Sequence, residues 1–371
     1  MITVKKFLDD REDVLGLDVY FSIHSCVYFG KSNWVTKVLY RSQQVCQREF
    51  FCQVVKFLFG QLLYIYKMSL KVRKVAALTG HNGSVYALEK AFEDKLVFSG
   101  SSDRFIAMWN LETLQAEKFA AKFPAIVYAI CHIPERGLLI AGTSAGSVHV
   151  LDLNTKEEVK ILQHHTAPLF DIKYSLQTNC FYTASGDGNL AVCSLETLSM
   201  VKIKKLCTEK VRSIAFNPSG TEMAVACGDC SIHIFDPESM EEKHTWKAHD
   251  LSANIVRYSP DGNVILTGGR DAHLNIWDAK GYGLIKSIPA HNFAIYDIAF
   301  SPDHKLFATA SRDKTLKIWN TETFELLVRI NKENFEGHVN SVNKVLWSRF
   351  NNYLVSTGDD RAVMVWEVAV E

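Results

Sequence analysis

Four stretches of the chain repeat a histidine, a hydroxyl residue, an aspartate and a tryptophan at one fixed spacing. Histidine, serine and aspartate are the residue types of a hydrolase triad, in which the histidine takes a proton from the hydroxyl group and the aspartate orients the histidine. The four sets are His81, Ser99, Asp103 and Trp109; His249, Thr267, Asp271 and Trp277; His291, Thr309, Asp313 and Trp319; and His338, Ser356, Asp360 and Trp366.

Four identical active sites in one chain would be implausible, so a structural role is the better interpretation of these sets. In each copy we expect the aspartate to accept from the histidine, the histidine to reach the hydroxyl group, and the hydroxyl group to reach the indole N–H. Buried polar groups need such partners because an orphan costs roughly 1–3 kcal/mol. The sets are therefore predicted to stabilise the fold, and no catalytic residue is predicted.

Three further copies depart from this pattern at the corresponding positions. One has lost the whole polar set to apolar residues, one keeps only the aspartate, and one keeps everything except the tryptophan. Loss of all partners together is nearly neutral, whereas loss of one strands the others. The corresponding residues are Phe123, Ala141, Ala145 and Leu151; Cys207, Val225, Asp229 and Phe235; and His165, Thr183, Asp187 and Cys193.

The elements that must hold these residues also repeat. From Ala290 to Trp319 the chain alternates apolar and polar residues, meets a proline turn at Pro302, and continues through two more short strands. Equivalent positions recur every 42 residues from Trp109 to Trp319, and Trp366 follows after 47. A repeat of this length cannot cover its own apolar face and must stack on its neighbours. Seven stacked copies are predicted, one of them with a five-residue insertion.

The last copy supplies only three strands before the chain ends at Glu371. Its fourth strand must come from elsewhere, and residues 72–78, which precede the first complete copy, are the natural donor. Closing the circle in this way removes the exposed sheet edge of an open array. The predicted fold is all-β: a seven-bladed β-propeller of four-stranded antiparallel blades, closed by strand 72–78 and spanning residues 68–371.

These repeats resemble the WD-repeat (WD40, G-protein β-subunit-like) family of β-propellers. The likeness covers about residues 70–371 and is carried by four motifs in which His and Trp lie 28 residues apart. The resemblance implies the same structural role for the polar sets and a non-catalytic scaffold that binds peptides or proteins. The motifs run from Gly80-His81 to Trp109-Asn110, from Ala248-His249 to Trp277-Asp278, from Ala290-His291 to Trp319-Asn320, and from Gly337-His338 to Trp366-Glu367.

The same resemblance implies where a partner would bind: on the face around the central channel, at positions three and five after each histidine and just before each aspartate. Aromatic residues come from copies one, two, three and six, and cations from copies four to six. We hypothesise a face with an aromatic and a cationic half for a protein segment that carries an acidic or phosphorylated stretch beside an apolar anchor. The residues are Tyr86, Ser102, Tyr128, Phe170, Lys210, Arg212, Arg270, Tyr296, Arg312, Asn343 and Asp359.

Alternatives to this function remain. Some of the rings could merely fill the mouth of the channel. A nucleic-acid-associated or ribonucleoprotein assembly factor would need a broad basic stripe. A propeller enzyme would need acids, bases or metal ligands converging on the channel, where these positions supply Asp359 as the one carboxylate. Cys227 and Cys230 have the spacing of a zinc or redox pair, but no second pair accompanies them. We expect no metal and no cofactor.

Composition agrees with a globular protein: of 371 residues, 47% are hydrophobic and 22% are charged. Lys plus Arg and Asp plus Glu both total 41, so bulk charge indicates neither a nucleic-acid nor a membrane-surface partner. Nine cysteines form no legible disulfide framework, which favours a reducing, cytoplasmic location. The propeller itself is expected to be monomeric outside a complex.

Residues 1–67 stand outside the repeat. They are rich in aromatic and β-branched residues, and the apolar run from Phe57 to Tyr66 is too short to cross a bilayer. One interpretation is an accessory segment that packs on the ring or on a membrane. The one we favour is that translation naturally begins at Met68 and that the preceding residues are not native coding sequence. If the segment is native, we expect it to be poorly ordered.

Overall fold

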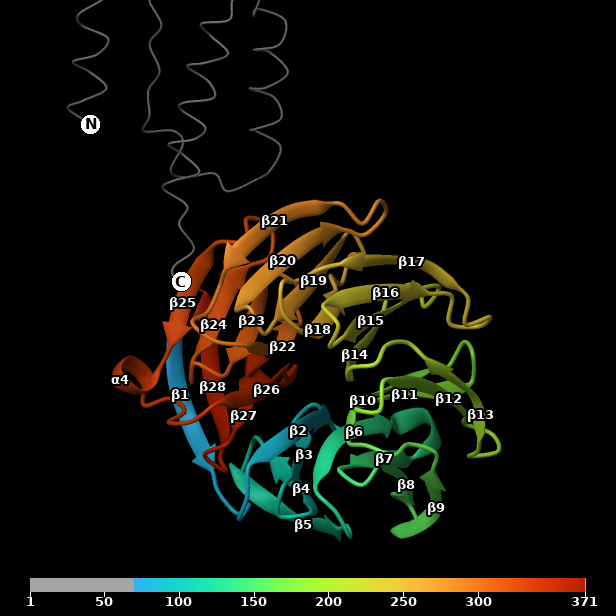
Figure 1. The fold of residues 1–371 in the computed structure, drawn as a ribbon. Helices are drawn as coiled ribbons and strands as arrows, with labels where there is room; N and C mark the ends of the chain where they lie inside the picture. The colour runs from blue at the N-terminus through green and yellow to red at the C-terminus, as the bar shows by residue number, and fades with distance from the viewer. Residues whose placement is uncertain (1–69, 371) are drawn as a thin grey trace, which may run out of the picture. The chain divides into compact units, whose positions relative to one another are not determined.

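The computed structural model describes residues 70–370, and its strands form seven four-stranded antiparallel sheets. The sheets follow one another around a central axis (Figure 1). The prediction of an all-β, seven-bladed propeller is confirmed. The expectations for residues 1–67 lie outside the described residues.

Each of the first six blades is a meander of four consecutive strands. Blade 1 contains β2 (Val85–Lys90), β3 (Leu96–Ser101), β4 (Phe105–Asn110) and β5 (Gln115–Lys122). Blade 2 contains β6 (Val127–Ile133), β7 (Leu138–Thr143), β8 (Ser147–Asp152) and β9 (Glu157–Gln163). Blade 3 contains β10 (Leu169–Ser175), β11 (Cys180–Ser185), β12 (Asn189–Ser194) and β13 (Met200–Lys205). Blade 4 contains β14 (Val211–Phe216), β15 (Met223–Cys227), β16 (Ser231–Phe235) and β17 (Glu242–Lys247).

Blades 5 and 6 continue the same pattern, and blade 7 is composite. Blade 5 contains β18 (Ala253–Tyr258), β19 (Val264–Gly269), β20 (His273–Asp278) and β21 (Leu284–Pro289). Blade 6 contains β22 (Ile295–Phe300), β23 (Leu306–Ser311), β24 (Leu316–Asn320) and β25 (Leu326–Ile330). Blade 7 contains β26 (Val342–Trp347), β27 (Leu354–Gly358), β28 (Val363–Val370) and, as its fourth strand, β1 (Leu70–Leu78).

The composite blade closes the ring as predicted. β1 pairs antiparallel with β28, with Leu70 opposite Val370 and Leu78 opposite Val363. In Figure 1 the blue β1 lies against the red β28. Because hydrogen bonds between the two ends of the described chain complete this sheet, the ring has no open gap at the seam. The strand begins at Leu70, two residues before the predicted start.

Burial along each blade explains the residue types of its strands. The second strands, such as β3 and β23, are buried throughout, whereas fourth strands such as β13 and β21 are almost entirely exposed. Neighbouring sheets pack their apolar faces together. One cluster joins Ile318 of blade 6 to Trp366 of blade 7. Within blade 6, Trp319 stacks on Phe307 at 6.0 Å between ring centroids. Apolar burial of this kind supplies the main stabilisation of the ring.

Turn chemistry follows the sequence with two departures. Gly220 and Gly262 adopt φ of 71° and 73° at the ends of the turns that Pro218 and Pro260 begin, which favours glycine there. Pro134 instead opens a short 3-10 helix, η3 (Pro134–Arg136). Leu114 has φ of 57° although it is not a glycine, and it lies in the turn before β5, which starts at Gln115.

The five-residue insertion forms a single helical turn, α4 (Lys332–Phe335), between β25 and β26. Asn331 caps this turn by accepting the backbone N–H of Asn334 at 2.9 Å. A second short element, η4 (Phe350–Asn352), lies between β26 and β27. In the described part of the chain, no helix is long and apolar enough to cross a membrane.

Candidate functional site

The polar sets of blades 1, 5, 6 and 7 are assembled as hydrogen-bonded chains. In blade 1, His81 Nδ1 lies 2.9 Å from Asp103 Oδ2, His81 Nε2 lies 2.7 Å from Ser99 Oγ, and Trp109 Nε1 donates to the same Oγ at 2.6 Å. The equivalent bonds of blades 5, 6 and 7 measure between 2.8 and 3.1 Å.

The donors and acceptors of this chain fix its protonation. An indole N–H can only donate, so Ser99 accepts from Trp109 and gives its own hydrogen to His81 Nε2. The histidine is then left with its hydrogen on Nδ1, which donates to the aspartate. All four hydroxyl residues have 0% exposed surface. A hydroxyl group that is sealed in the core and already bound to an indole cannot act as a nucleophile.

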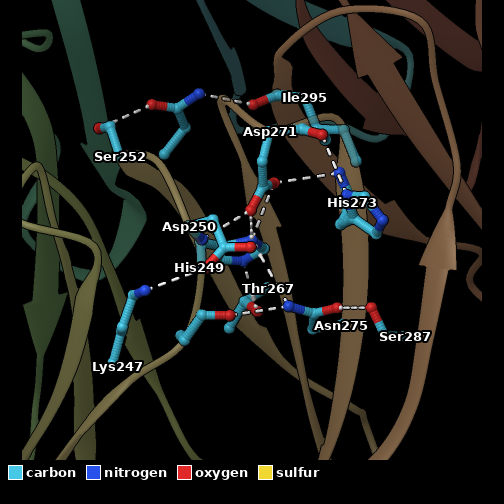
Figure 2. A network of polar contacts seen from close by, with 12 residues as sticks. Lys247, His249, Asp250, Ser252, Thr267, Asp271, His273, Asn275, Ser287 and Ile295 are labelled. Carbon is cyan, nitrogen blue, oxygen red and sulfur yellow. Dashed lines mark hydrogen bonds and ion pairs between the residues drawn. The ribbon is translucent and has the colours of Figure 1, made fainter.

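Blade 5 extends this chain, as Figure 2 shows. Asn275 donates to the backbone oxygen of Ala248 at 2.7 Å and accepts from Ser287 at 2.6 Å. Burial alone would raise the pKa of Asp271, but hydrogen bonds from His249 and from backbone N–H groups outweigh it and leave that pKa at about 2. The carboxylate is therefore charged at neutral pH and holds the His249 ring in place.

Blade 3 replaces the missing indole with a second histidine. His165 keeps its bonds to Asp187 and Thr183 at 3.0 and 2.9 Å. His164 places its Nε2 3.4 Å from the Thr183 hydroxyl and 4.0 Å from Cys193 Sγ, on the side where the other blades have tryptophan. Burial and the neighbouring His165 lower the pKa of His164 to about 4. Its ring is therefore neutral at physiological pH.

Blades 2 and 4 contain a different network that the sequence comparison of the copies missed. In blade 2, Ser147 Oγ lies 2.8 Å from His149 Nε2, and His149 Nδ1 lies 2.5 Å from Glu158 Oε1. Phe123 packs edge-on against His149, where a conventional blade has its own histidine. The polar set of this copy has thus moved to strands β8 and β9, contrary to our interpretation of a wholly apolar replacement.

Blade 4 repeats this second network at matching positions. Ser231 Oγ lies 2.8 Å from His233 Nε2, and His233 Nδ1 lies 2.8 Å from Glu242 Oε1. The serine, histidine and glutamate of the two blades are each 84 residues apart, which is two repeat lengths. That spacing was a legible signal, but it falls outside the His–Ser/Thr–Asp–Trp positions from which the copies were aligned.

The predicted partner positions of blades 1 to 4 form a continuous arc at the channel. The rings of Tyr86 and Tyr128 lie 4.8 Å apart between centroids, and those of Tyr128 and Phe170 lie 5.8 Å apart. Arg212 and Lys210 then place their cationic groups 4.7 and 5.7 Å from the Phe170 centroid. We call these five residues the aromatic arc. The cation–π contacts join its aromatic and cationic parts into one surface.

Arg212 carries an incompletely matched charge. Its Nε is buried and has no hydrogen-bond partner in the described part of the protein. Burial lowers the pKa of its guanidinium, and the positive charge of Arg270 lowers it further, while Tyr296 acts in the opposite direction. Arg270 is exposed, as is Arg312, whose guanidinium lies 5.9 Å from the Phe293 centroid. An anion placed near the Arg212 guanidinium could accept hydrogen bonds from several guanidinium N–H groups.

Other predicted positions are already engaged within the ring. Asn343 donates to the backbone oxygen of Val85 at 3.1 Å, which ties blade 7 to blade 1, and to Asp359 at 2.9 Å. Ser102 is half-buried, and its backbone N–H donates to the Ser84 carbonyl at 2.8 Å. The internal bonds of the Asn343 side chain compete with any bond to a partner, whereas the bond of Ser102 is made by its backbone.

Deeper in the channel the structure reveals an ion network that the sequence analysis did not predict. A cavity of about 210 Å³ is lined by three acids and four bases from the first strands of their blades. Arg257 and Asp297 form an ion pair at 3.0 Å, and Lys173 lies 3.8 Å from Asp171. The seven residues are Glu89, Asp171, Asp297, Lys90, Lys173, Arg257 and Lys344.

Acids and bases lie close together in this cavity. Burial raises the pKa of Glu89, whereas for Asp171 the cations Lys173, Lys344 and Arg257 outweigh burial and lower it. Asp359 is the one carboxylate of the predicted partner positions, and the three acids of the cavity lie outside those positions. The signal was present: Glu89, Lys173 and Arg257 follow their copies' histidine position by eight residues each. Because Arg257 and Lys173 each pair with an acid, the arrangement resembles an internal ion network.

The predicted cysteine pair is arranged differently from its sequence motif. Cys227 lies beside Cys207, which occupies the position of the conventional histidine, and Asp229 completes a cluster whose ligand atoms lie within 4.8 Å of one another. Hydrogen bonding from the Cys227 thiol lowers the pKa of Cys207. Cys230 is half-buried on the following turn. Cys227 thus lies with the sequence-distant Cys207, and Cys230, which the CxxC spacing had suggested as its partner, is not in the cluster.

Comparison with known families agrees with the repeat. The model described as "WD domain, G-beta repeat" matches residues 72–110, 240–278, 283–320 and 330–367. The model described as "Anaphase-promoting complex subunit 4 WD40 domain" matches residues 172–258. The matches of the first model contain the four complete polar sets, and the second model spans parts of blades 3 to 5. No curated protein matches the chain.

Proposed function

Because the chain belongs to the WD-repeat family of β-propellers, whose fold generally serves as a protein-interaction scaffold, we propose that it is a non-catalytic scaffold that binds a protein segment on the channel face. The segment would pair an apolar anchor with an acidic or phosphorylated stretch. Fold alone does not identify a partner, so the proposal depends on the residues of the face.

The observation that carries this proposal is the aromatic arc. Tyr86, Tyr128 and Phe170 lie within 6 Å of their neighbours and are all half-buried, so each ring keeps part of its surface open. Tyrosine and arginine dominate binding hot spots because they bury a large area and also make directed hydrogen bonds. An apolar side chain laid on this arc would cover the remaining ring surface.

The charge beside the arc supports the acidic part of the segment. Arg212 has a buried Nε without an acceptor among the described residues, and Arg270 and Arg312 are exposed on the neighbouring blades. A carboxylate or phosphate would accept from these guanidinium groups in a charge-assisted bond. The same anion would offset the cost of burying the Arg212 charge.

The internal bonds of the polar sets and the ion pairs of the channel cavity both favour a non-catalytic role over an enzyme. A cytoplasmic location is part of the proposal, and it is supported by six free cysteines among residues 70–370. We also propose that the propeller is monomeric outside its complex.

Affinity capture with the full chain tests the proposal. The variant Tyr86→Ala/Arg270→Ala/Arg312→Ala should lose at least tenfold of each specific partner, because it removes one aromatic and two cationic groups from the face. The matched control Phe92→Ala/Lys118→Ala/Lys160→Ala changes one aromatic and two cationic residues that are exposed elsewhere. It should retain the partners.

Identical partner lists from the wild type and the face variant would overturn the proposal. Captured nucleic acid, released progressively by salt, would support the nucleic-acid alternative instead. A synthetic phosphopeptide with an aliphatic anchor and its unphosphorylated form then separate the cationic from the aromatic contribution. Equal affinity of the two peptides would remove the phosphate preference.

A further inference from the structure

Blade 4 has a thiol pair where conventional blades have a histidine. In blades 1, 3, 5, 6 and 7, the histidine at this place donates to the turn aspartate, and the backbone N–H of the next residue donates to the same carboxylate. Blade 4 has Cys207 at the histidine position. It keeps the aspartate as Asp229, and it adds Cys227 at the end of β15.

Asp229 has lost the partners that its counterparts keep. Its Oδ1 still accepts the backbone N–H and the hydroxyl group of Ser231, at 3.1 and 2.5 Å. Within residues 70–370, no hydrogen bond reaches its Oδ2. The two sulfur atoms and the carboxylate oxygen lie within 4.8 Å of one another, the sulfurs buried and the carboxylate exposed. Two thiols and a carboxylate thus converge at a point that solvent can reach from one side.

From this convergence we propose a metal site in blade 4, with Cys207 Sγ, Cys227 Sγ and Asp229 Oδ2 as protein ligands for a thiol-binding divalent cation of the Zn²⁺ class. Zn²⁺ is borderline-soft, takes sulfur and oxygen ligands, and prefers four-coordinate tetrahedral geometry. The three ligands come from the loop before β14, the end of β15 and the turn before β16. The fourth position faces solvent and would hold water.

The geometry requires only a small local closure. Zinc–sulfur bonds of about 2.3 Å and zinc–oxygen bonds of about 2.1 Å place tetrahedral ligand atoms roughly 3.5–3.8 Å apart. The observed limit of 4.8 Å therefore needs a contraction of at most about 1.3 Å, which rotation of the exposed Asp229 side chain can supply. Binding would release a proton from each of the two thiols to solvent, including the one that Cys207 now donates to the Glu209 carbonyl at 3.2 Å.

Such a site would give blade 4 a replacement for its missing histidine. In the conventional blades the histidine links the loop before the first strand to the turn before the third. Cys207 lies on the same loop and Asp229 on the same turn, so a bound cation would restore that link between them. The scaffold would then be stabilised by the metal without any catalytic role for it.

The test uses the metal-free full chain, kept reduced and titrated with Co²⁺, which occupies zinc sites and reports them by absorption. We expect one equivalent to bind with a thiolate-to-cobalt charge-transfer band of two sulfurs, and Zn²⁺ to displace it. Cys207→Ser and Cys227→Ser should each lose at least half of the band. Cys230→Ser, on the adjacent turn, is the matched control and should bind as the wild type does.

Asp229→Asn covers the case in which a cysteine variant fails to fold, since it changes an exposed residue and keeps an oxygen for Ser231. It should bind Co²⁺ at least tenfold more weakly at unchanged melting temperature of the metal-free protein. Absence of the band up to millimolar Co²⁺ would overturn the proposal. So would a band that survives both cysteine variants, equal loss in Cys230→Ser, or wild-type affinity in Asp229→Asn.

Discussion

Blades 6 and 2 both bury a histidine between a hydroxyl group and a carboxylate, yet they hold it from different strands. In blade 6 the histidine precedes the first strand and its acid is Asp313, whose side chain is 3% exposed. In blade 2 the histidine lies on β8 and its acid is Glu158 on the edge strand β9, with a side chain 40% exposed. The same three functional groups, a hydroxyl, an imidazole and a carboxylate, therefore form a network in both blades, but the carboxylate is buried in one and exposed in the other.

This difference shows what the fold requires of a blade. A polar link among strands is present in all the blades described above, but the position of its histidine is not fixed. The depth of the acid decides the energetic consequence, because a buried orphan cannot find water whereas an exposed one can. Conventional networks should therefore be intolerant of substitution, and the networks of blades 2 and 4 should be tolerant.

Asp313→Ala should cause the largest loss in this comparison. It strands the Nδ1–H of a buried His291 and also the backbone N–H of Asn292, and it should lower the free energy of unfolding by about 2–3 kcal/mol. Denaturant unfolding of the full chain measures it, with Glu322→Ala, an exposed acid of the same blade, as the control. Unchanged stability would refute the structural role of the network.

His149→Ala should lower the free energy of unfolding by less, about 1–2 kcal/mol. The loss arises because the change leaves a space beside Phe123 and removes the hydrogen bond to Ser147. Glu158 remains half-exposed and regains water. The control is Lys160→Ala, an exposed residue of β9, the strand that also contains Glu158. A loss equal to that of Asp313→Ala would abolish the distinction between the two kinds of network.

The fold could be predicted from the sequence because the repeat is regular. The 42-residue spacing located seven sheets, and the missing fourth strand of blade 7 identified β1 as its donor. The conventional networks followed from fixed spacings, which require the same atoms to meet in every copy. Prediction stopped where a copy departs from the pattern, because an absent residue does not show what replaces it.

Three particular replacements illustrate that limit. His164 substitutes for an indole from the loop rather than from the third strand, which no alignment of the tryptophan positions would find. Cys207 meets Cys227 only because the turn brings them together, while the nearer Cys230 in sequence does not join the cluster. The channel ions Glu89, Lys173 and Arg257 come from alternate blades, so their mutual proximity depends on the closed ring.

Acidification should destabilise the conventional networks to a smaller, graded extent. Burial lowers the pKa of His291 and His165 below 6.5, so the folded state binds fewer protons than the unfolded state. Their stabilisation is complete above pH 6.5 and is lost as the pH falls from there through the folded pKa, at up to about 1.4 kcal/mol per pH unit for each group. Asp271, with a folded pKa of about 2, adds a further loss between pH 4 and 2.

Unfolding free energies at constant ionic strength between pH 7.5 and 5 measure the histidine part. Equal stability across that range would contradict it. Because Asp271 remains charged throughout, any loss observed there cannot come from its protonation. The contribution of the Asp271 carboxyl group to stability and the contribution of the histidines are thus separated, because they are lost in different pH ranges.

Glu242→Gln should give the smallest effect and the sharpest contrast with Asp313. The glutamine keeps an oxygen that can accept from His233 Nδ1, now 2.8 Å from the glutamate, and its side chain is 33% exposed, so water can replace a lost contact. We expect a loss below about 1 kcal/mol. Asp313→Asn, the matching change at a 3% exposed acid, should cost more because its amide hydrogens lie in a buried site already filled by donors. Equal losses from these two isosteric changes would mean that depth does not decide the strength of a blade network.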